Sequence, residues 1–471
     1  MSLNASNDSN PSSSDGPQSD VAWWRYLTGY QWFVFIMSTC AWMFDCLDQQ
    51  LFILARNNAV AALAPTLDTK EYGGYATAIF VAGWAIGGLI FGSIGDRIGR
   101  AKTLAITVLL YSVCTGLSAL STSIYDFFFY RLLTGLGVGG VFGLAVALVS
   151  DALPDHVRSK ALAWLQALSA VGNVTAGMIS LSFAKVDPNI SWKYLFLIGA
   201  TPAFLCIFIM LRLKEPEKWV QAKKNSLETG KAMGSYRSLL GEKRWRKPAL
   251  LGMILCVAGV IGVWGVGFFS PELVGSALEK SLRDEGLEGE ALKTARAQWT
   301  AYSLMIQNVG AFLGMLCFGR LAQAIGRKPA FYIGTFAAMA ATIFFFTCFK
   351  TRADIWMSGV MGFAQLALLA GYAIYLPELF PTRLRSTGTS FCYNVGRFIA
   401  ATGPFTLAML QKWLADAAVA KLPEGADALM QADARLSAFR SAACCMSAVY
   451  LLALFVLPFL PETKGQPLPE D

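Results

Sequence analysis

Two carboxylates stand three residues apart, at Asp45 and Asp48, inside an apolar stretch near the start of the sequence. In a helix this spacing places both side chains on one face. Two carboxylates in a low-dielectric cleft resist ionising together, so one of them would hold a proton near neutral pH. The pair therefore predicts a site that takes up and releases protons. The alternative is a hydrogen-bonded structural pair between neighbouring helices.

A third ionisable side chain, Arg131, also lies within an apolar stretch. Counted along a helix, Arg131 and Asp48 are each about 10 Å from the near end of their own stretches, so they lie at similar depth. An arginine beside a carboxylate favours the ionised form, and separating the two would let the carboxylate take up a proton. We therefore expect proton coupling at Asp45, Asp48 and Arg131, with a purely structural ion pair as the alternative.

Arg397 lies about 15 Å into a later apolar stretch, near the middle of a membrane span. Tyr393 and Asn394 stand four and three residues before it, so all three share a helical face. A guanidinium beside an amide and a phenol suits a carboxylate, which predicts an anion-binding site. The alternative is an ion pair with a membrane carboxylate such as Asp45. Further candidates for the same cavity are Trp264, Phe268, Gln166, Asn173, Gln307, Asn308, Gln365, Tyr372 and Tyr375, although each could equally serve helix packing.

The composition excludes an ordinary soluble protein. Of 471 residues, 55% are hydrophobic and 15% are charged, whereas average globular chains have about 45–50% and about 25%. The mean hydropathy is +0.48. Ten cysteines without a CxxC pair and a single histidine, His156, argue against a disulfide framework and a zinc site. No phosphate-binding G-x-x-x-x-G-K-[ST] motif is present, so we expect no enzyme and no cofactor, with the proton as coupling ion.

Twelve stretches are long and apolar enough to cross a membrane, since a span needs about 20 mainly apolar residues. They lie near residues 31–55, 73–94, 103–121, 125–149, 160–183, 193–213, 248–270, 298–320, 329–349, 354–376, 387–411 and 437–460. We expect an all-α membrane protein of twelve transmembrane helices in two pseudo-symmetric six-helix bundles. Its expected parts are a disordered tail (1–22), a first bundle (23–213), a basic linker (214–247), a second bundle (248–460) and a second tail (461–471).

The positive charges are concentrated on one side of the predicted spans. The linker 214–247 holds ten bases and four acids, a net of +6, whereas the opposite loop 271–297 holds four bases and six acids, a net of −2. Cytoplasmic loops carry the excess of Lys and Arg. The linker and both termini are therefore expected in the cytoplasm, and the net charge of +8 needs no nucleic-acid partner.

The two halves carry the same motifs at one offset. The glycine-rich segment 92–100 corresponds to 319–328, and the segment 151–159 corresponds to 378–386, each 227 residues later. An even number of spans separates the copies, so the halves are parallel repeats, and a substrate is expected near mid-membrane between them. Arg397 corresponds to Ala170, so its charge is not part of the repeated architecture. In the second copy Gln323 and Ala324 replace an Asp-Arg pair.

These motifs, together with the run 131–137, resemble the major facilitator superfamily over nearly the whole chain outside the tails. Pro216–Glu217 and residues 461–465 are similar to its sugar-porter and organic-ion-transporter branch, whereas 45–48 and 393–397 are similar to aromatic-acid:proton symporters. The resemblance implies two bundles that rock between states, making and breaking contacts at their cytoplasmic ends. The residues expected to form these gating contacts are Asp96, Arg97, Gly99, Arg100, Arg158, Glu217, Arg327, Glu378, Arg385 and Glu462.

The sequence therefore predicts a secondary active transporter, with proton-coupled symport of a small organic anion, such as an aromatic or other carboxylic acid, as the first hypothesis. A sugar:proton symporter is the first alternative, although residues 262–271 lack the amide cluster expected for hydroxyl groups. A drug or organic-cation exporter is the second, and Arg397 argues against it. A non-transporting sensor on the same fold is a third. We expect a monomer in a bacterial inner membrane, whose partners are lipid and a small molecule.

Overall fold

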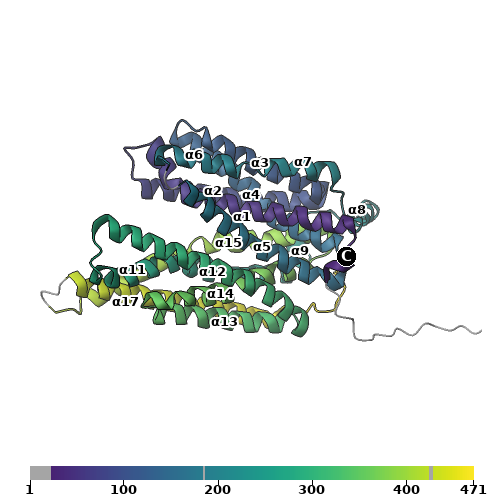
Figure 1. Cartoon of the computed structure of the whole chain (residues 1–471). Coiled ribbons are helices and arrows are strands. Elements are labelled where there is room, and N and C mark those ends of the chain that lie inside the picture. Colours follow the sequence, from purple (N-terminus) through teal and green to yellow (C-terminus); the bar gives the residue numbers. More distant parts are fainter. Residues whose placement is uncertain (1–22, 184–185, 424–427, 471) are drawn as a thin grey trace, which may run out of the picture.

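The computed structural model describes residues 23–183, 186–423 and 428–470, and every regular element within them is helical. The expected disordered tail, 1–22, lies outside the described residues. Figure 1 shows two lobes of long, roughly parallel helices, with the first half of the chain in one lobe and most of the second half in the other. Short helices and the C-terminal segment gather at one end of the lobes, which we call the linker face; the other end is the opposite face.

The first half begins with a short 3-10 turn, Trp23–Tyr26. Seven helices follow: α1 (Gly29–Leu63), α2 (Thr69–Ile98), α3 (Arg100–Ala119), α4 (Ile124–Ala152), α5 (Asp155–Ser182), α6 (Pro188–Gly199) and α7 (Ala203–Arg212). Capping boxes define two of the starts: Thr28 and Gln31 exchange hydrogen bonds at α1, and Ser123 and Asp126 do so at α4. The expected span 193–213 is divided between α6 and α7 by a turn before Ala203.

The linker contains two helices, α8 (Glu217–Thr229) and α9 (Tyr236–Gly241). The second half contains α10 (Lys243–Val260), α11 (Ser270–Asp284), α12 (Gly289–Ile325), α13 (Arg327–Cys348), α14 (Trp356–Glu378), α15 (Arg385–Ala400), α16 (Gly403–Val419), α17 (Ala428–Met446) and α18 (Tyr450–Val456). A π-helical turn, Ile261–Val266, and a 3-10 turn join α10 to α11. The prediction of a loop at residues 271–297 is wrong, because α11 and the start of α12 cover most of this segment.

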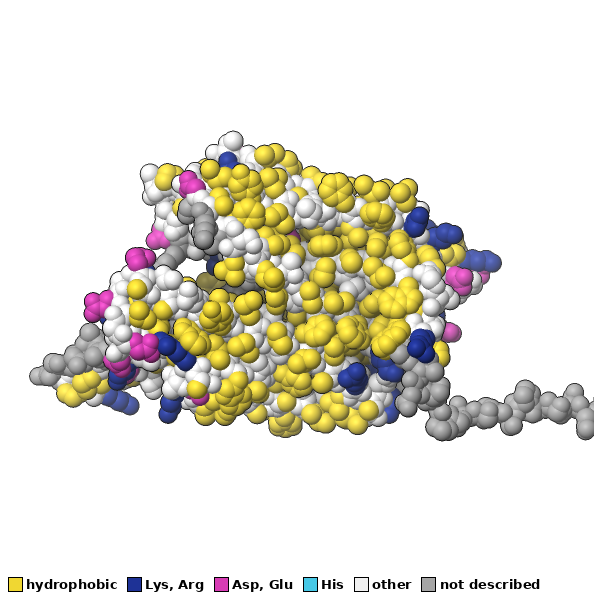
Figure 2. All heavy atoms as spheres, in the orientation of Figure 1, with side chains coloured by type: hydrophobic (Ala, Val, Ile, Leu, Met, Phe, Trp, Pro, Cys, Tyr) yellow, Lys and Arg dark blue, Asp and Glu magenta, His cyan; other side chains and the backbone are white. Residues whose placement is uncertain are grey.

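Ten helical segments in the described part of the chain are long and apolar enough to cross a membrane. They correspond to ten of the twelve expected spans. The other two are α1, whose hydropathy is lowered by polar and charged residues, and the pair α15–α16, which a turn at residues 401–402 interrupts. The surface between the two faces is dominated by apolar side chains, with charged residues near the two ends (Figure 2). The chain is therefore an integral membrane protein with multiple helical spans.

Sharp turns at two glycines mark the duplicated motif. Gly99 separates α2 from α3 with φ 128°, and Gly326 separates α12 from α13 with φ 105°. Residues with a Cβ rarely adopt this backbone conformation. The two positions are 227 residues apart, as the repeat requires, so the same turn redirects the chain in both halves.

The halves pack along two seams, α2 against α15 and α5 against α12. Small residues allow this close approach: a Cβ at Gly92 would lie 2.5 Å from the Cβ of Ser390, and one at Gly319 would lie 2.3 Å from the Cβ of Ala163. Both seams approach the linker face, where the two motif copies lie. The structure therefore has its halves joined toward that face.

We predict that Gly319→Ala destabilises the joined state, because the added methyl group meets Ala163. Overpacking costs about 1–3 kcal/mol. Gly177→Ala is the matched control, since a Cβ at this glycine of α5 has no neighbour within 4 Å; it should gain up to about 1 kcal/mol of helix propensity. Thermal unfolding in detergent measures both. An equal rise in the unfolding temperature of both variants would contradict the close approach.

Candidate functional site

A cavity of about 470 Å³ lies between the halves and opens toward the opposite face, where the molecule is hollowed between its lobes (Figure 2). Side chains of α1 and α2 form one wall, and side chains of α10, the π-helical turn, α15 and α16 form the other. The residues that line it are Gln49, Phe52, Ile53, Arg56, Gly74, Thr77, Ala78, Phe80, Val81, Ala82, Trp84, Val260, Trp264, Arg397, Phe398, Ala400, Ala401, Pro404 and Phe405. A ligand in this cavity would touch both halves at once.

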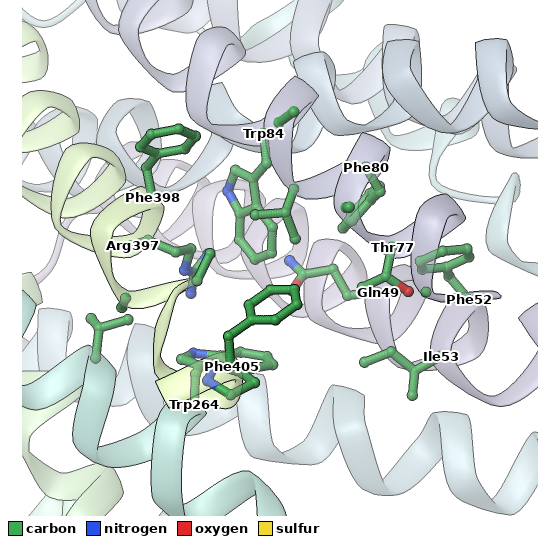
Figure 3. Close-up of a pocket in the computed structure, with 18 of the residues that line it drawn as sticks. Gln49, Phe52, Ile53, Thr77, Phe80, Trp84, Trp264, Arg397, Phe398 and Phe405 are labelled. Carbon is green, nitrogen blue, oxygen red and sulfur yellow. The ribbon is translucent and has the colours of Figure 1, made fainter. Parts of the chain in front are cut away.

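Arg397 is 9% exposed and lies at the inner end of this cavity (Figure 3). Its Nη2 donates a 2.9 Å hydrogen bond to the phenol of Tyr393. Its guanidinium carbon lies 3.7 Å from the ring centroid of Trp84 and 5.6 Å from that of Trp264. Nε and Nη1 have no hydrogen-bond partner. The aromatic faces hold the cation while leaving N–H groups for a planar anion.

A second, smaller cavity of about 80 Å³ lies deeper. It shares Gln49, Ile53, Trp264 and Arg397 with the larger one, so these residues separate the two spaces. The amides of Asn173 and Asn308 also line it and join α5 to α12 through a 3.3 Å hydrogen bond. Gln166 and Tyr393 contribute further polar groups to its wall.

The carboxylates of Asp45 and Asp48 are fully buried in α1. Gln49 donates a 2.9 Å hydrogen bond to one oxygen of Asp45, while the other oxygen has no partner. Both oxygens of Asp48 also have none. Within the described residues neither carboxylate forms an ion pair, although Asp45 lies within the electrostatic range of Arg397 and Asp48 within that of Arg131. Two buried carboxylates thus lack an ion-pair partner among the described residues, and one of them, Asp45, lies near Arg397.

Arg131 is fully buried in α4 and is held by hydroxyl groups. Its side chain donates hydrogen bonds to Thr115, Ser118 and Thr134, at 2.7–3.2 Å. The guanidinium carbon lies 4.7 Å from the ring centroid of Phe196, and Nη1 has no partner. The predicted proximity to Asp48 is therefore electrostatic rather than a direct ion pair.

Several predicted binding residues lie away from both cavities. Asn394 fills the α2–α15 seam against Gly88 and donates a 3.0 Å hydrogen bond to the Ser390 carbonyl. The other three are buried in the second half: Gln307 accepts a hydrogen bond from Ser270, Gln365 donates to Thr342, and Tyr372 donates to the Leu255 carbonyl. The side chain of Phe268 lies outside the described residues. The substrate-binding roles of these five residues stay predictions, and the four that are described contact protein groups.

Most residues that line the larger cavity were not identified from the sequence, among them Gln49, Phe52, Arg56, Trp84 and Phe405. Gln49 had a usable signal, since it stands one turn from Asp45. Arg56 stands two turns from Gln49 and continues the same face. The two phenylalanines and Trp84 had no signal, because aromatic residues in apolar helices usually face lipid or pack.

At the linker face the two motif copies form a network between the halves. Asp96 accepts hydrogen bonds from the backbone N–H groups of Ser386 and Thr387, at 3.2 and 2.8 Å, and from the Thr387 hydroxyl, at 2.7 Å. Its carboxylate thus caps the N-terminus of α15, where a negative charge is favoured. Asp151 forms ion pairs with Arg100 of its own half and Arg385 of the other.

The second copy repeats part of this arrangement. Arg327 forms a bidentate pair with Glu378, at 2.8 and 3.0 Å, and donates a 2.5 Å hydrogen bond to Ser159 across the seam. Gln323, in the position of Asp96, only donates to the His156 carbonyl, at 3.1 Å. The α5–α12 seam therefore relies on a neutral contact where the α2–α15 seam uses a carboxylate.

Two glutamates cap equivalent helices. Glu215 accepts from the backbone of Arg100 and Lys102 at the start of α3, and Glu462 accepts from that of Arg327 and Lys328 at the start of α13. Burial opposes ionisation of Glu462, but its backbone N–H donors outweigh burial and hold the pKa of the carboxyl below its usual value.

Other predicted gating residues have different surroundings. Arg158 is buried and pairs with Asp155 of its own helix, whereas Arg97 and Glu217 are exposed. Glu217 makes no hydrogen bond or ion pair with the described residues, and it is its neighbour Glu215 that caps α3. Burial and the nearby Arg158 and Arg385 lower the pKa of Lys218, at the start of α8, to about 8.

Comparisons with known proteins agree with this fold. Residues 49–404 match the sequence profile of the Major Facilitator Superfamily. The cis,cis-muconate transport protein of Acinetobacter baylyi is 27% identical over 80% of this chain and 86% of its own length, and the benzoate transport protein of that organism is 25% identical over 82% and 84%. The proton:xylose symporter XylE of E. coli has a TM-score of 0.71 and 20% identity, over 93% of this chain and 98% of XylE, which shows a shared fold.

We predict that Asp96→Asn shifts the population toward states in which the linker face is open. The variant loses a charge that accepts three hydrogen bonds across the seam, and charge-assisted hydrogen bonds contribute about 1.5–3 kcal/mol each. Double electron–electron resonance measures the distance between spin labels at Lys102 and Arg320, in a background from which the exposed native cysteines have been removed. Asp96→Asn should give longer distances than the protein that keeps Asp96. Asp416→Asn, on the exposed face of α16, is the control. Identical distance distributions in all three proteins would remove the gating role of Asp96.

Proposed function

This chain belongs to the major facilitator superfamily, and from that premise we propose that it takes up a small organic anion together with protons. Membership makes it a secondary transporter of a small molecule rather than an enzyme. The substrate, the coupling ion and the direction of transport are the proposed parts. We propose that the linker face is cytoplasmic, because it carries most of the positive charge.

The observation that carries the proposal is the state of Arg397. It is a buried arginine with two partner-free nitrogens, and it lines a cavity shared by both halves. A buried cation without an ion-pair partner is costly, so a bound carboxylate stabilises it. Neither a sugar nor an organic cation would supply that negative charge. The two named relatives, which transport muconate and benzoate, support the same class of substrate.

Proton coupling is proposed to use the buried carboxylates beside this site. Gln49 lines the cavity and donates to Asp45, and Asp45 lies within the electrostatic range of Arg397. A substrate carboxylate on Arg397 reduces the field that favours ionised Asp45, so the bound anion and a proton on Asp45 favour each other. Asp48, without any hydrogen-bond partner and in the field of Arg131, is the second proton site.

The conformation supports alternating access. The linker face is closed by the two seams, while the larger cavity opens toward the opposite face. With the linker face in the cytoplasm, this is an outward-open state. A substrate and its proton enter from outside, and opening of the linker-face network then releases both inside.

We predict that Asp48→Asn abolishes pH-driven accumulation but keeps exchange, because exchange needs binding and movement of the halves without net proton transfer. Purified protein in liposomes, with radiolabelled benzoate as the probe, measures both activities. Asp416→Asn should keep both. Equal loss of accumulation and exchange by Asp48→Asn would mean that Asp48 is structural or contacts the substrate.

A second prediction concerns Arg397. Arg397→Ala should weaken benzoate binding by at least about 2 kcal/mol, and Arg397→Lys should be intermediate because it keeps the charge but loses the planar fork. Calorimetry on detergent-purified protein measures the affinity, with xylose as an uncharged probe. The contradicting result has three parts: Arg397→Ala stays folded, xylose binds equally to this variant and to the unaltered protein, and benzoate binds to neither. In that case the anion hypothesis fails, and a sugar becomes the proposed substrate.

A further inference from the structure

A second arginine, Arg56, lines the larger cavity. It lies in α1, seven residues beyond Gln49, which is two helical turns on the same face and about 10 Å along the axis. Its Nη1 donates a 2.5 Å hydrogen bond to Thr77 of α2, and its Nε has no partner. Like Arg397, it therefore has no ion-pair partner among the described residues.

The walls of this cavity offer no negative charge to either arginine. Among its described lining residues there is no Asp or Glu. Three buried arginines at the linker face differ in this respect: Arg100, Arg327 and Arg385 each pair with a carboxylate. Two cations in one acid-free cavity repel each other weakly when it is empty, and they favour an anion at each end when it is filled.

Between the two cations the cavity is apolar. Figure 3 shows Arg397 at one end and Thr77, the partner of Arg56, at the other, with the rings of Trp84 and Phe405 and the amide of Gln49 between them. Phe52, Phe80, Ile53 and Trp264 also line the cavity. A flat, unsaturated body fits such a wall, because aromatic faces bind planar groups by stacking and by edge contacts.

Resting on the organic-anion function above, we propose that the cavity selects dicarboxylates: one carboxylate on Arg397, the second on Arg56, and a planar diene or benzene ring between the two. The amide of Gln49 lies between Arg397 and Thr77, the partner of Arg56 (Figure 3). A monocarboxylate satisfies Arg397 and leaves Arg56 without its anion.

Two matched pairs of probes test this selection. Muconate and sorbate share a six-carbon diene and differ by one carboxylate, and terephthalate and benzoate share a ring and differ in the same way. Affinities are measured by calorimetry for the full chain, Arg56→Gln, Arg56→Lys and Arg397→Gln. Arg283→Gln is the control for loss of an arginine near the opposite face, since Arg283 pairs with Glu279 outside this cavity.

In the unaltered protein and in Arg283→Gln, each diacid should bind at least about tenfold more tightly than its monoacid, the difference that one charge-assisted hydrogen-bonded contact makes. Arg56→Gln should weaken the diacids to the level of the monoacids and leave the monoacids within about twofold. Arg56→Lys should keep part of the preference. Arg397→Gln should weaken all four probes.

Three results would overturn the inference. Equal affinity for the members of both pairs in the unaltered protein, or equal weakening of diacids and monoacids by Arg56→Gln, would show that Arg56 attracts anions without contacting a second carboxylate. In either case binding that still depends on Arg397 would leave the organic-anion function standing. If none of the four carboxylates binds the unaltered protein, the organic-anion function fails and the dicarboxylate inference fails with it.

Discussion

A charged side chain in the middle of a membrane span costs about 2.5–3.5 kcal/mol on insertion scales, so each one needs a partner, water or a ligand. This constraint divides the buried ionisable groups of this chain into two sets. At the linker face, Arg100, Arg327 and Arg385 are paired with carboxylates, and these pairs hold the halves together. Near the centre, Arg397 and Asp48 keep polar atoms without partners. The first set is paired with other protein charges. The second set can instead bind an anion, at Arg397, and a proton, at Asp48.

The two seams occupy equivalent positions in the internal repeat, but different interactions hold them together. Arg100 and Arg327 occupy equivalent positions, yet the first copy places Asp96 beside the α15 N-terminus and the second places Gln323 beside a backbone carbonyl. The α2–α15 seam thus depends on a charge and a helix dipole. The α5–α12 seam depends on close packing, on an amide pair and on the hydrogen bond from Arg327 to Ser159. Removing the seam carboxylate therefore acts on the first seam, whereas added volume acts on both.

Hydropathy and the repeat predicted the helical membrane fold, because both depend on patterns that a single sequence contains. Arg397 was found for the same reason, since a lone charge in an apolar run is conspicuous. Asn394 shares a helical face with Arg397, but it fills the seam against Gly88. Residue spacing could not predict this, because spacing does not say where the neighbouring helix lies. Trp84 and Arg56 were missed since only the folded arrangement brings α2 and the far end of α1 to the same cavity as α15. Glu215 was missed beside Glu217, because which residue caps α3 depends on the path of the linker.

The contact between Arg397 and Trp84 links the two halves, since the arginine belongs to α15 and the tryptophan to α2. Its strength comes from the net charge of the guanidinium acting on the ring. A carboxylate that binds the free N–H edge leaves the ring in place but cancels much of that charge. If the proposed anion binds here, we therefore expect the contact between the halves to be strongest when the site is empty and weaker when the anion is bound. The bound anion would then lower the barrier to the movement that transports it.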